Sequence, residues 1–579
     1  MNHDLAAGAS LPAATTTSGT PKWCWLAVIA AGAIGLGLMA DSVWTSSATY
    51  DEVTYLEIST RWWRTGDQAL ISRMGSPLLF WKLQQAPVLW ILDQTNHGNW
   101  IDQPVKYQEQ MLPWLRLGCL WIWAVALALI VIWSRALYGP RAMAFAALIF
   151  AFSPTLLGHA ALVTMEIPIM AATTGMFFLF WKFLQTDDRR YFWATAVVGG
   201  LAWSLKYTAV LIPPMLAAVW VLDSWRRGDR KMLQMAQDLG AEMLAFLAIM
   251  GLSNLVLTQF ALLPMSQTKD SHPGIDQRVP EIVRNMVERA VEVPIPQEIV
   301  GFANQVLQQR SGGLSYLFGE RRGMGWWYYY FVAIAVKLPL TFFALILGRT
   351  ILSRQIKSSG RDSMLLVVMA LFLFVTAIAS SRNFGIRYLF PISPLAIIWV
   401  SGLAESSRIE SRSVRRCTMG LAVLGLMGQV MAVASVHPHE ITYFNEIAGG
   451  PVGGRKVLAD SNLDWGQGLK SLTRLQQARP ELKDMTLFYF GNIDPRNYGV
   501  AGKCLLLTAL ENPPELPPTL SVNTPYVAIS ASLEWGPWGP ENYFSKLRAR
   551  EPLLMTDDHT IAIYRKEDLE DHNLSVRAN

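Results

Sequence analysis

The stretch CWLAVIAAGAIGLGLMA, residues 24–40, is followed shortly by TYDEVTYLE, residues 49–57. The first stretch is apolar or small throughout, and about 17–25 such residues are enough to cross a bilayer. The second places Asp51 and Glu52 side by side just beyond it. Carboxylates this close to a membrane span indicate a functional site. They also stand where a general base would meet a lipid-borne substrate.

The composition extends this membrane assignment to the whole chain. Of 579 residues, 52% are hydrophobic and only 16% are charged, and the mean hydropathy is +0.25. A soluble domain carries roughly a quarter charged residues, so the excess apolar surface requires a nonaqueous solvent. The 23 Trp and 17 Tyr are typical of many membrane–water boundaries. The sequence therefore predicts a multispan integral membrane protein.

Hydrophobic runs of near-spanning length recur along the chain, and about eleven can be distinguished. They lie near residues 24–40, 117–133, 142–157, 164–182, 191–205, 207–222, 243–263, 326–347, 363–380, 387–402 and 416–436. The first run lacks a clear cleavage site after it and is interpreted as an uncleaved anchor. Residues 1–22 are rich in Ala, Ser, Thr and Gly and are predicted to be a disordered cytoplasmic N-terminus.

Basic residues gather in alternate loops between these runs. The clusters are Arg135 and Arg141; Lys182, Arg189 and Arg190; Arg226, Arg227, Arg230 and Lys231; Arg349, Arg354, Lys357 and Arg361; and Arg408, Arg412, Arg415 and Arg416. Short cytoplasmic loops are enriched in Lys and Arg, so the N-terminus is predicted inside and the C-terminus outside the plasma (inner) membrane.

This orientation divides the rest of the chain into two predicted domains. Residues 23–436 form a transmembrane domain with outer loops at 41–116 and 264–325, and residues 437–579 form an extracytoplasmic domain. The tail contains the strand-like runs MTLFYF, YVAIS and TIAIYR, separated by Pro- and Gly-rich turns. A small α/β domain is therefore expected outside the membrane.

The four cysteines, Cys24, Cys119, Cys417 and Cys504, show no CxxC or Cys/His ligand spacing. Neither a zinc site nor a disulfide framework is predicted. The sequence indicates no cofactor, although it leaves divalent metal dependence open.

The predicted topology brings several charged residues toward the outer face. Cations and carboxylates gathered there suit a substrate that carries an anionic head group and meets a hydroxyl to be deprotonated. The residues concerned are Asp51, Glu52, Glu166, Lys206 with Tyr207, Lys337, Arg382 and Arg387. Simpler interpretations also stand. On these interpretations the cations are interfacial side chains whose charged ends reach the lipid headgroups. Glu166 is then an acidic residue at a helix N-terminus, and Asp51 and Glu52 are a solvated pair in a loop.

The chain resembles a GT-C-fold membrane glycosyltransferase of the protein O-mannosyltransferase-like type, related to dolichyl-phosphate-mannose–protein mannosyltransferases. The segments that carry the resemblance occur in order through nearly the whole chain. They are YDEVTYLE, GSPLLFWKL, SPTLLGHAALVTMEIP, LAWSLKYTAVLIPP, YLFGERRGMGWWYYYFVAIAVKLPL, NFGIRYLFPISPL and HEITYFNEIAGGPVGGRKVLADSNLDWGQGL. The resemblance implies a mainly α polytopic bundle with a GT-C-like architecture.

The resemblance also implies roles for individual residues. Asp51 corresponds to the family's catalytic base in the first outer loop, with Glu52 beside it. Glu166 stands at the second acidic position, where the family pattern has Asp. The family's HPPL histidine and first proline are replaced by Gly75 and Ser76. The substrate-binding candidates, mostly contacts of the lipid phosphate, are Lys82, Lys206, Tyr207, Lys337, Arg387 and Tyr388.

The expected activity is transfer of a sugar from a polyprenyl-phosphate carrier to a hydroxyl on a protein or glycoconjugate, on the noncytoplasmic face. Direct displacement would invert the anomeric centre. The expected partners are the lipid-linked donor, the acceptor and the bilayer, with no nucleic acid. A lipid-linked sugar flippase and a glycan ligase of another lipid-linked class remain alternatives.

The segment DSNLDWGQ, residues 460–467, has two interpretations. Its alternating Asp and Asn side chains are typical of a metal site, and its place after the last hydrophobic run equally favours a motif that packs the tail against the membrane domain.

Overall fold

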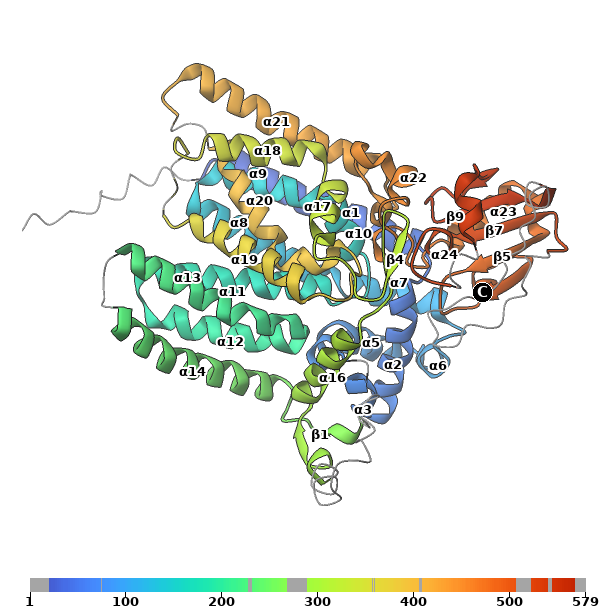
Figure 1. Ribbon diagram of the computed structural model, residues 1–579, viewed down its shortest axis with the longest axis horizontal. Helices are drawn as coiled ribbons and strands as arrows, with labels where there is room; N and C mark the ends of the chain where they lie inside the picture. Colours follow the sequence, from blue (N-terminus) through green and yellow to red (C-terminus); the bar gives the residue numbers. More distant parts are fainter. Residues whose placement is uncertain are drawn as a thin grey trace, which may run out of the picture.

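The computed structural model describes residues 20–567 apart from 74, 228–231, 268–288, 357, 359, 406–408, 507–521 and 540–543. Residues 1–19, most of the segment predicted to be disordered, lie outside the described residues. Long helices run side by side, and a five-stranded sheet lies beyond one end of them (Figure 1). The chain is a mainly helical membrane bundle with a small α/β unit near its C-terminus, which confirms the predicted fold class.

The helices of the bundle follow the hydrophobic runs of the sequence. They are α1 (Lys22–Thr45), α8 (Leu120–Leu137), α9 (Pro140–Ala151), α10 (Pro154–Ala160), α11 (Glu166–Thr186), α12 (Arg189–Leu205), α13 (Ile212–Arg227), α14 (Met232–Leu257), α17 (Tyr329–Lys337), α18 (Leu340–Ile351), α19 (Ser363–Ala379), α20 (Ser393–Ser401) and α21 (Arg412–Ala434). Two 3-10 turns, η2 (Tyr207–Leu211) and η4 (Ile386–Ile392), precede α13 and α20. Every predicted run overlaps one of these helices or a consecutive pair.

The number of full spans is smaller than the number of hydrophobic runs. Within the described residues, seven helices are long and apolar enough to cross a membrane, or nine if each of two bent pairs counts as one span. The estimate of about eleven also included α12 and α19, which have 17 residues each. A helix of that length rises about 26 Å, slightly less than the hydrocarbon core of about 30 Å. The two counts therefore differ in whether α12 and α19 are counted as spans, and not in the position of the helices.

The bent pairs break where proline interrupts a hydrophobic run. The axes of α9 and α10 differ by 64°, and those of α17 and α18 differ by 105°. Pro154 is the first residue of α10, and Pro339 directly precedes α18. Proline cannot donate a helical hydrogen bond and favours an extended residue before it. The predicted runs near 142–157 and 326–347 therefore change direction at these two prolines.

The two predicted outer loops carry short elements. The first contains α2 (Tyr50–Thr65), α3 (Ala69–Arg73), α4 (Leu78–Phe80), the π-helical turn η1 (Trp81–Gln85), α5 (Ala86–Gln94), α6 (Gly98–Asp102) and α7 (Gln108–Leu117). The second contains β1 (Leu262–Pro264), η3 (Met265–Gln267), β2 (Pro294–Pro296), α16 (Gln297–Ser311), β3 (Ser315–Leu317) and β4 (Glu320–Arg322). Helix α2 begins with a capping box, because the side chains of Thr49 and Glu52 each accept the other's backbone N–H. This cap fixes the start of the helix that carries Asp51.

The tail folds around one sheet with the strand order β6-β5-β7-β9-β8. Its strands are β5 (Met485–Tyr489), β6 (Lys503–Leu506), β7 (Tyr526–Ser530), β8 (Leu554–Met555) and β9 (Ile561–Arg565), and its helices include α22 (Gly450–Gly454), α23 (Leu469–Ala478) and α24 (Ala531–Glu534). Strand β5 pairs in parallel with β6 and β7, whereas β9 runs antiparallel to β7 and β8. All five residues of β5 are buried, as expected for a central parallel strand. The three predicted strands are β5, β7 and β9.

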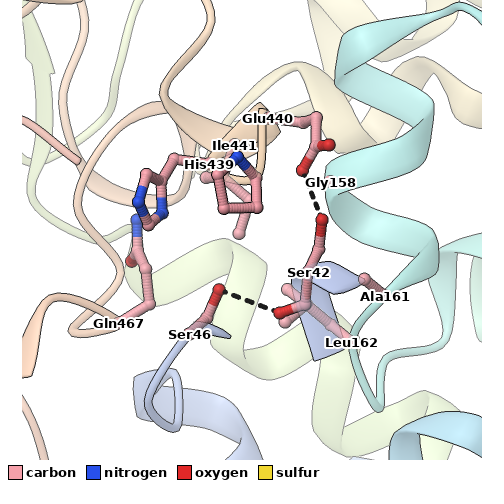
Figure 2. Close-up of a pocket in the computed structure, with 10 residues that line it drawn as sticks. Ser42, Ser46, Gly158, Ala161, Leu162, His439, Glu440, Ile441 and Gln467 are labelled. Atoms are coloured by element: carbon pink, nitrogen blue, oxygen red, sulfur yellow. Dashed lines mark hydrogen bonds between the residues drawn. The ribbon is translucent and has the colours of Figure 1, made fainter. Parts of the chain in front are cut away.

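The tail packs directly onto the C-terminal end of α1. Figure 2 shows the residues that line a small cavity at this joint, where Ser42 Oγ donates a hydrogen bond to Glu440. The hydrogen bond is 2.8 Å long, and the cavity has a volume of about 10 Å³. A cavity of this size holds at most about one water molecule. Gly158 lies in its wall, and a Cβ at this position would come within 2.6 Å of the Ile441 backbone nitrogen. The joint is therefore a close-packed contact that fixes the tail relative to the bundle.

Candidate functional site

Arg387 is the centre of a charged cluster at the end of the bundle that contacts the C-terminal tail. It lies in the 3-10 turn η4, directly after Gly385 and Ile386. Its Nη1 lies 3.3 Å from Asp51 Oδ2 and 3.5 Å from Glu166 Oε1. Its Nε donates a 3.1 Å hydrogen bond to the Phe384 carbonyl. One guanidinium thus joins carboxylates that are 115 positions apart in the sequence.

Lys206 completes the cluster from the other side of Glu166. Its Nζ lies 3.0 Å from Glu166 Oε1. Lys206 follows α12 with an extended backbone, φ −161° and ψ 133°, and η2 begins at the next residue. This break in the helix turns the ammonium toward Glu166, the first residue of α11. The cluster holds two carboxylates and two cations, so each side chain meets an opposite charge.

Aromatic rings border the same cations. The Arg387 guanidinium lies 4.2 Å from the centre of the Trp465 ring, and Lys206 Nζ lies 5.0 Å from the centre of the Tyr388 ring. Cations over aromatic faces are stabilised by the ring quadrupole, and more strongly where water is excluded. The rings therefore hold the two cations without neutralising their charge.

Asp51 is the most exposed member of the cluster. Its side chain is 29% exposed, compared with 5% for Glu166, 10% for Arg387 and 15% for Lys206. Loss of solvent raises the pKa of Asp51, a change that Glu166 reinforces and that Arg387 and Lys206 oppose. An accessible carboxylate with a raised pKa is better suited to accept a proton than an ordinary aspartate.

A cavity of about 680 Å³ begins beside this cluster. Lys206 and Tyr388 belong to its wall as well as to the cluster, and Tyr207 and Met165 lie next to them. Much of the remaining wall is apolar and comes from η2, α16 and α19. The apolar wall residues include Val210, Leu211, Phe302, Val306, Trp327, Phe372 and Ile378. The wall also carries two cations, Lys206 and Arg310. A cavity with cationic and apolar lining fits a ligand with an anionic head and a hydrocarbon chain.

Glu52 is a predicted catalytic residue that the structure places elsewhere. Its carboxylate pairs with Arg116 through two contacts, Nε to Oε1 at 2.9 Å and Nη2 to Oε2 at 2.7 Å. It also accepts hydrogen bonds from the backbone nitrogens of Thr49 and Val163. Both partners of the ion pair are at most 1% exposed. Glu52 therefore connects α2, α7 and the segment before α11, and its oxygens are occupied by these contacts.

Two predicted substrate-binding lysines, Lys82 and Lys337, hydrogen-bond to residues outside the cluster. Lys82 Nζ donates to Gln259 Oε1 at 2.9 Å. Lys337 is buried, and its Nζ donates to the carbonyls of Ile441 and Asn462 at 2.8 and 2.7 Å. Lys82 lies on the π-helical turn η1, whose geometry the hydrophobic pattern did not reveal. The structure therefore groups Lys206, Arg387 and Tyr388, with Tyr207 at the cavity wall, and separates Lys82 and Lys337 from them.

Sequence reasoning did not assign Asp460 and Trp465 to the cluster. Burial raises the pKa of Asp460 to about 6, while Arg387 acts against this rise. Both residues belong to DSNLDWGQ, the motif for which the sequence left a metal site and a tail-packing role open. Among the residues that the structure describes, no group of three or more His, Cys, Asp or Glu is arranged to hold a metal ion.

Residues 113–251 match the sequence profile of the family described as dolichyl-phosphate-mannose-protein mannosyltransferase. The matched segment contains Glu166, Lys206 and Tyr207. This match confirms the resemblance to membrane glycosyltransferases that the sequence motifs indicated. No curated protein sequence matches the chain.

Two solved structures align with the chain over most of its length. ArnT from Cupriavidus metallidurans bound to undecaprenyl phosphate is 12% identical, with a TM-score of 0.47, and the match covers 94% of this chain and 98% of that one. The apo oligosaccharyltransferase of Archaeoglobus fulgidus is 12% identical, with a TM-score of 0.46, and the match covers 90% and 71%.

Proposed function

We propose that the protein transfers a sugar from a polyprenyl-phosphate carrier to a hydroxyl acceptor on the noncytoplasmic side of the membrane. The observation that carries this proposal is the cluster of Asp51, Glu166, Lys206 and Arg387, whose member Lys206 also lines the 680 Å³ cavity. The description of the matched family names a sugar on a dolichyl phosphate as donor and a protein as acceptor. That description supports a donor of the polyprenyl-phosphate type.

The donor is held at its phosphate and along its lipid chain. Lys206 and Arg387 supply positive charge for the phosphate, and the apolar cavity wall receives the first isoprene units. Hydrogen bonds between ionised partners are roughly twice as strong as neutral ones. Glu166 contacts both cations, at 3.0 and 3.5 Å, and keeps them close together before the donor arrives. Lys82, a phosphate contact expected from the sequence resemblance, and Lys337, an expected substrate-binding residue, are not part of this proposed phosphate site.

In the reaction, Asp51 accepts the proton of the acceptor hydroxyl while the hydroxyl oxygen attacks the anomeric carbon. The bond from that carbon to the phosphate oxygen breaks as the new bond forms. The phosphate leaves with the bonding electrons, and Lys206 and Arg387 stabilise its added negative charge. Attack from the face opposite the phosphate inverts the configuration at the anomeric carbon.

The proposed outer location is supported by the charge pattern of the sequence. Asp51 lies just after α1, and Arg135, Arg189 and Arg349 lie at helix ends beside the loops predicted to be cytoplasmic. On this orientation the charged cluster and the tail are on the same, noncytoplasmic side. This arrangement favours the plasma membrane, where polyprenyl-phosphate sugars are presented to external acceptors.

A transfer assay tests the proposal directly. The purified protein is reconstituted in liposomes with undecaprenyl-phosphate sugars that carry a labelled hexose or amino sugar, and extracted envelope proteins and glycoconjugates are added as acceptors. We expect the label to move to an acceptor with inverted anomeric configuration. Movement of intact donor across the bilayer without transfer would instead identify a flippase. Transfer of a whole glycan would identify a ligase, and phosphate on the product would identify a phosphotransferase.

A further inference from the structure

The motif DSNLDWGQ links the tail to the charged cluster. Its members Ser461, Asn462, Asp464 and Trp465 are all at most 2% exposed. The motif follows α21, the last hydrophobic helix, and precedes α23 of the tail. It is therefore a tail segment buried against the membrane site.

The Trp465 side chain contacts the cation of the cluster. The guanidinium of Arg387 lies 4.2 Å from the Trp465 ring centre, while its Nε is held by the Phe384 carbonyl. With the guanidinium fixed by the ring and by this hydrogen bond, Nη1 points to Asp51 and Glu166. The ring therefore limits the positions available to the guanidinium.

The backbone of Trp465 contacts α2, the helix that carries Asp51. The Trp465 carbonyl accepts a 2.7 Å hydrogen bond from the backbone N–H of Tyr50. Tyr50 is the first residue of α2 and directly precedes Asp51. One residue thus contacts both the Asp51 segment, through its backbone, and Arg387, through its ring.

Trp465 is itself held rigidly. Its backbone N–H donates to Gln467 Oε1 at 2.7 Å. The neighbouring Asp464 carboxylate accepts hydrogen bonds from Ser532 N at 2.8 Å and Gly466 N at 3.0 Å. Asn462 Oδ1 accepts from Ile386 N at 3.0 Å, directly before Arg387. The segment is therefore fixed to the tail on one side and to η4 on the other.

We propose that Trp465 is a positioning residue that sets the distance between Asp51 and Arg387, so that the tail forms part of the membrane site. This inference rests on the proposed function for its catalytic meaning. Its geometric content, that Trp465 keeps Arg387 next to Asp51, is testable without turnover.

Displacement of Arg387 has a consequence that a purely structural role of Trp465 would lack. Asp51 faces Arg387 and Lys206 of opposite charge and Glu166 of like charge, with Asp460 and Tyr55 within electrostatic reach. An opposite charge favours the ionised carboxylate. If the guanidinium moves away from Asp51, the pKa of Asp51 therefore rises.

The test compares Trp465→Leu and Trp465→Phe with the matched variant Trp535→Phe. Trp535 is another buried tail tryptophan, and its ring has other cations over it, Arg455 and Arg548, each at 5.5 Å. The titration of Asp51 is followed by infrared difference spectroscopy, with Asp51→Asn as the reference that lacks the band. The kcat and KM for an undecaprenyl-phosphate sugar are measured on the same preparations.

We expect Trp465→Leu to raise the pKa of Asp51 by about 0.5–1 unit and to lower kcat about tenfold, because the cation–π contact is lost. Trp465→Phe keeps a ring face and is expected to show a smaller change in the same direction. Trp535→Phe should leave both quantities unchanged. Two substitutions of Trp465 are used so that the test can still be made with one variant if the other does not fold.

An unchanged Asp51 titration in the folded Trp465 variants would overturn the inference. Equal effects of the Trp465 and Trp535 variants would also overturn it, since they would indicate a general loss of tail stability. A wild-type protein with no transfer activity would refute the proposed function alone, because the shift in Asp51 titration would still be observed.

Discussion

Asp51 and Glu52 are neighbours in the sequence, and each faces an arginine. The two ion pairs nevertheless differ in the number of contacts, in the contact distances and in burial. Glu52 and Arg116 make two contacts of 2.7 and 2.9 Å and are almost fully buried. Asp51 and Arg387 make one contact of 3.3 Å, and the Asp51 side chain is 29% exposed. The Glu52 carboxylate accepts further backbone hydrogen bonds, whereas the Asp51 carboxylate shares its arginine with Glu166.

The difference shows that two adjacent residues of one helix can have separate roles, one in stability and the other in the proposed reaction. Successive residues of a helix point about 100° apart, so Asp51 and Glu52 meet different surroundings. A carboxylate whose hydrogen-bonding capacity is filled stabilises the fold but has no capacity left for a substrate. A carboxylate with one long contact and partial exposure keeps the capacity to accept a proton.

The largest expected effect comes from Asp51→Asn. This substitution removes the proposed base but keeps the shape of the side chain, so transfer should fall by about 10²–10⁴-fold while thermal stability is unchanged. Initial rates with a labelled donor and a thermal unfolding curve measure the two quantities. The matched control is Glu57→Gln, at an exposed position of the same helix, which should keep full activity.

Glu52→Gln should have the opposite effect: it should lower the stability of the protein and leave turnover nearly unchanged. Loss of the charge leaves Arg116 buried without an anion, and breaking a buried ion pair in this way costs about 3–5 kcal/mol. We expect a clear fall in the unfolding temperature, with near-normal turnover in the fraction that remains folded. Normal stability combined with a loss of turnover would instead place Glu52 in the reaction.

Lys206→Met and Lys82→Met test which lysine contacts the phosphate. Lys206 lies in the cluster and the cavity wall, so its loss should lower kcat/KM about tenfold to a hundredfold, as expected for a charge-assisted contact. Lys82 hydrogen-bonds to Gln259 outside the cluster, and its loss should change kcat/KM less than about twofold. A stronger effect at Lys82 would restore the assignment made from the sequence resemblance.

The pH dependence of transfer should reflect the environment of Asp51. Because loss of solvent raises its pKa, activity should fall, as the pH decreases, at a higher pH than the usual aspartate value of about 3.9. The base works when ionised, so activity is present above this pKa and lost below it. Arg387→Met should move the acid limb to still higher pH, since it removes the cation that favours the ionised form. A pH–rate profile from about pH 4 to 8 measures the acid limb in the wild type and in Arg387→Met.

The membrane part of the fold was predictable because its signal is local. Hydrophobic runs such as residues 24–40 specify helices wherever they occur, and the strands β5, β7 and β9 were recognisable from their short apolar pattern. The alternating basic loops predicted that Asp51, Glu166, Lys206 and Arg387 share one face. The structure indeed brings these four together.

The separate roles of neighbouring residues were harder to predict. Thr49 and Glu52 match a capping-box pattern, and this was the available signal that Glu52 belongs to the helix start. Its pairing with Arg116 depends on tertiary structure, as does the contact of Trp465 with Arg387. The displacement of Lys82 follows from a π-helical turn that hydrophobic periodicity does not reveal.

The binding of undecaprenyl phosphate without sugar tests the central claim most directly, because it separates the phosphate site from the base. Affinity is measured for the wild type, Asp51→Asn and Arg387→Met in parallel with transfer. We predict that Asp51→Asn binds the carrier at least as tightly as the wild type but transfers no sugar, and that Arg387→Met binds it about tenfold to a hundredfold more weakly. Wild-type affinity in Arg387→Met, or wild-type transfer by Asp51→Asn, would contradict the account.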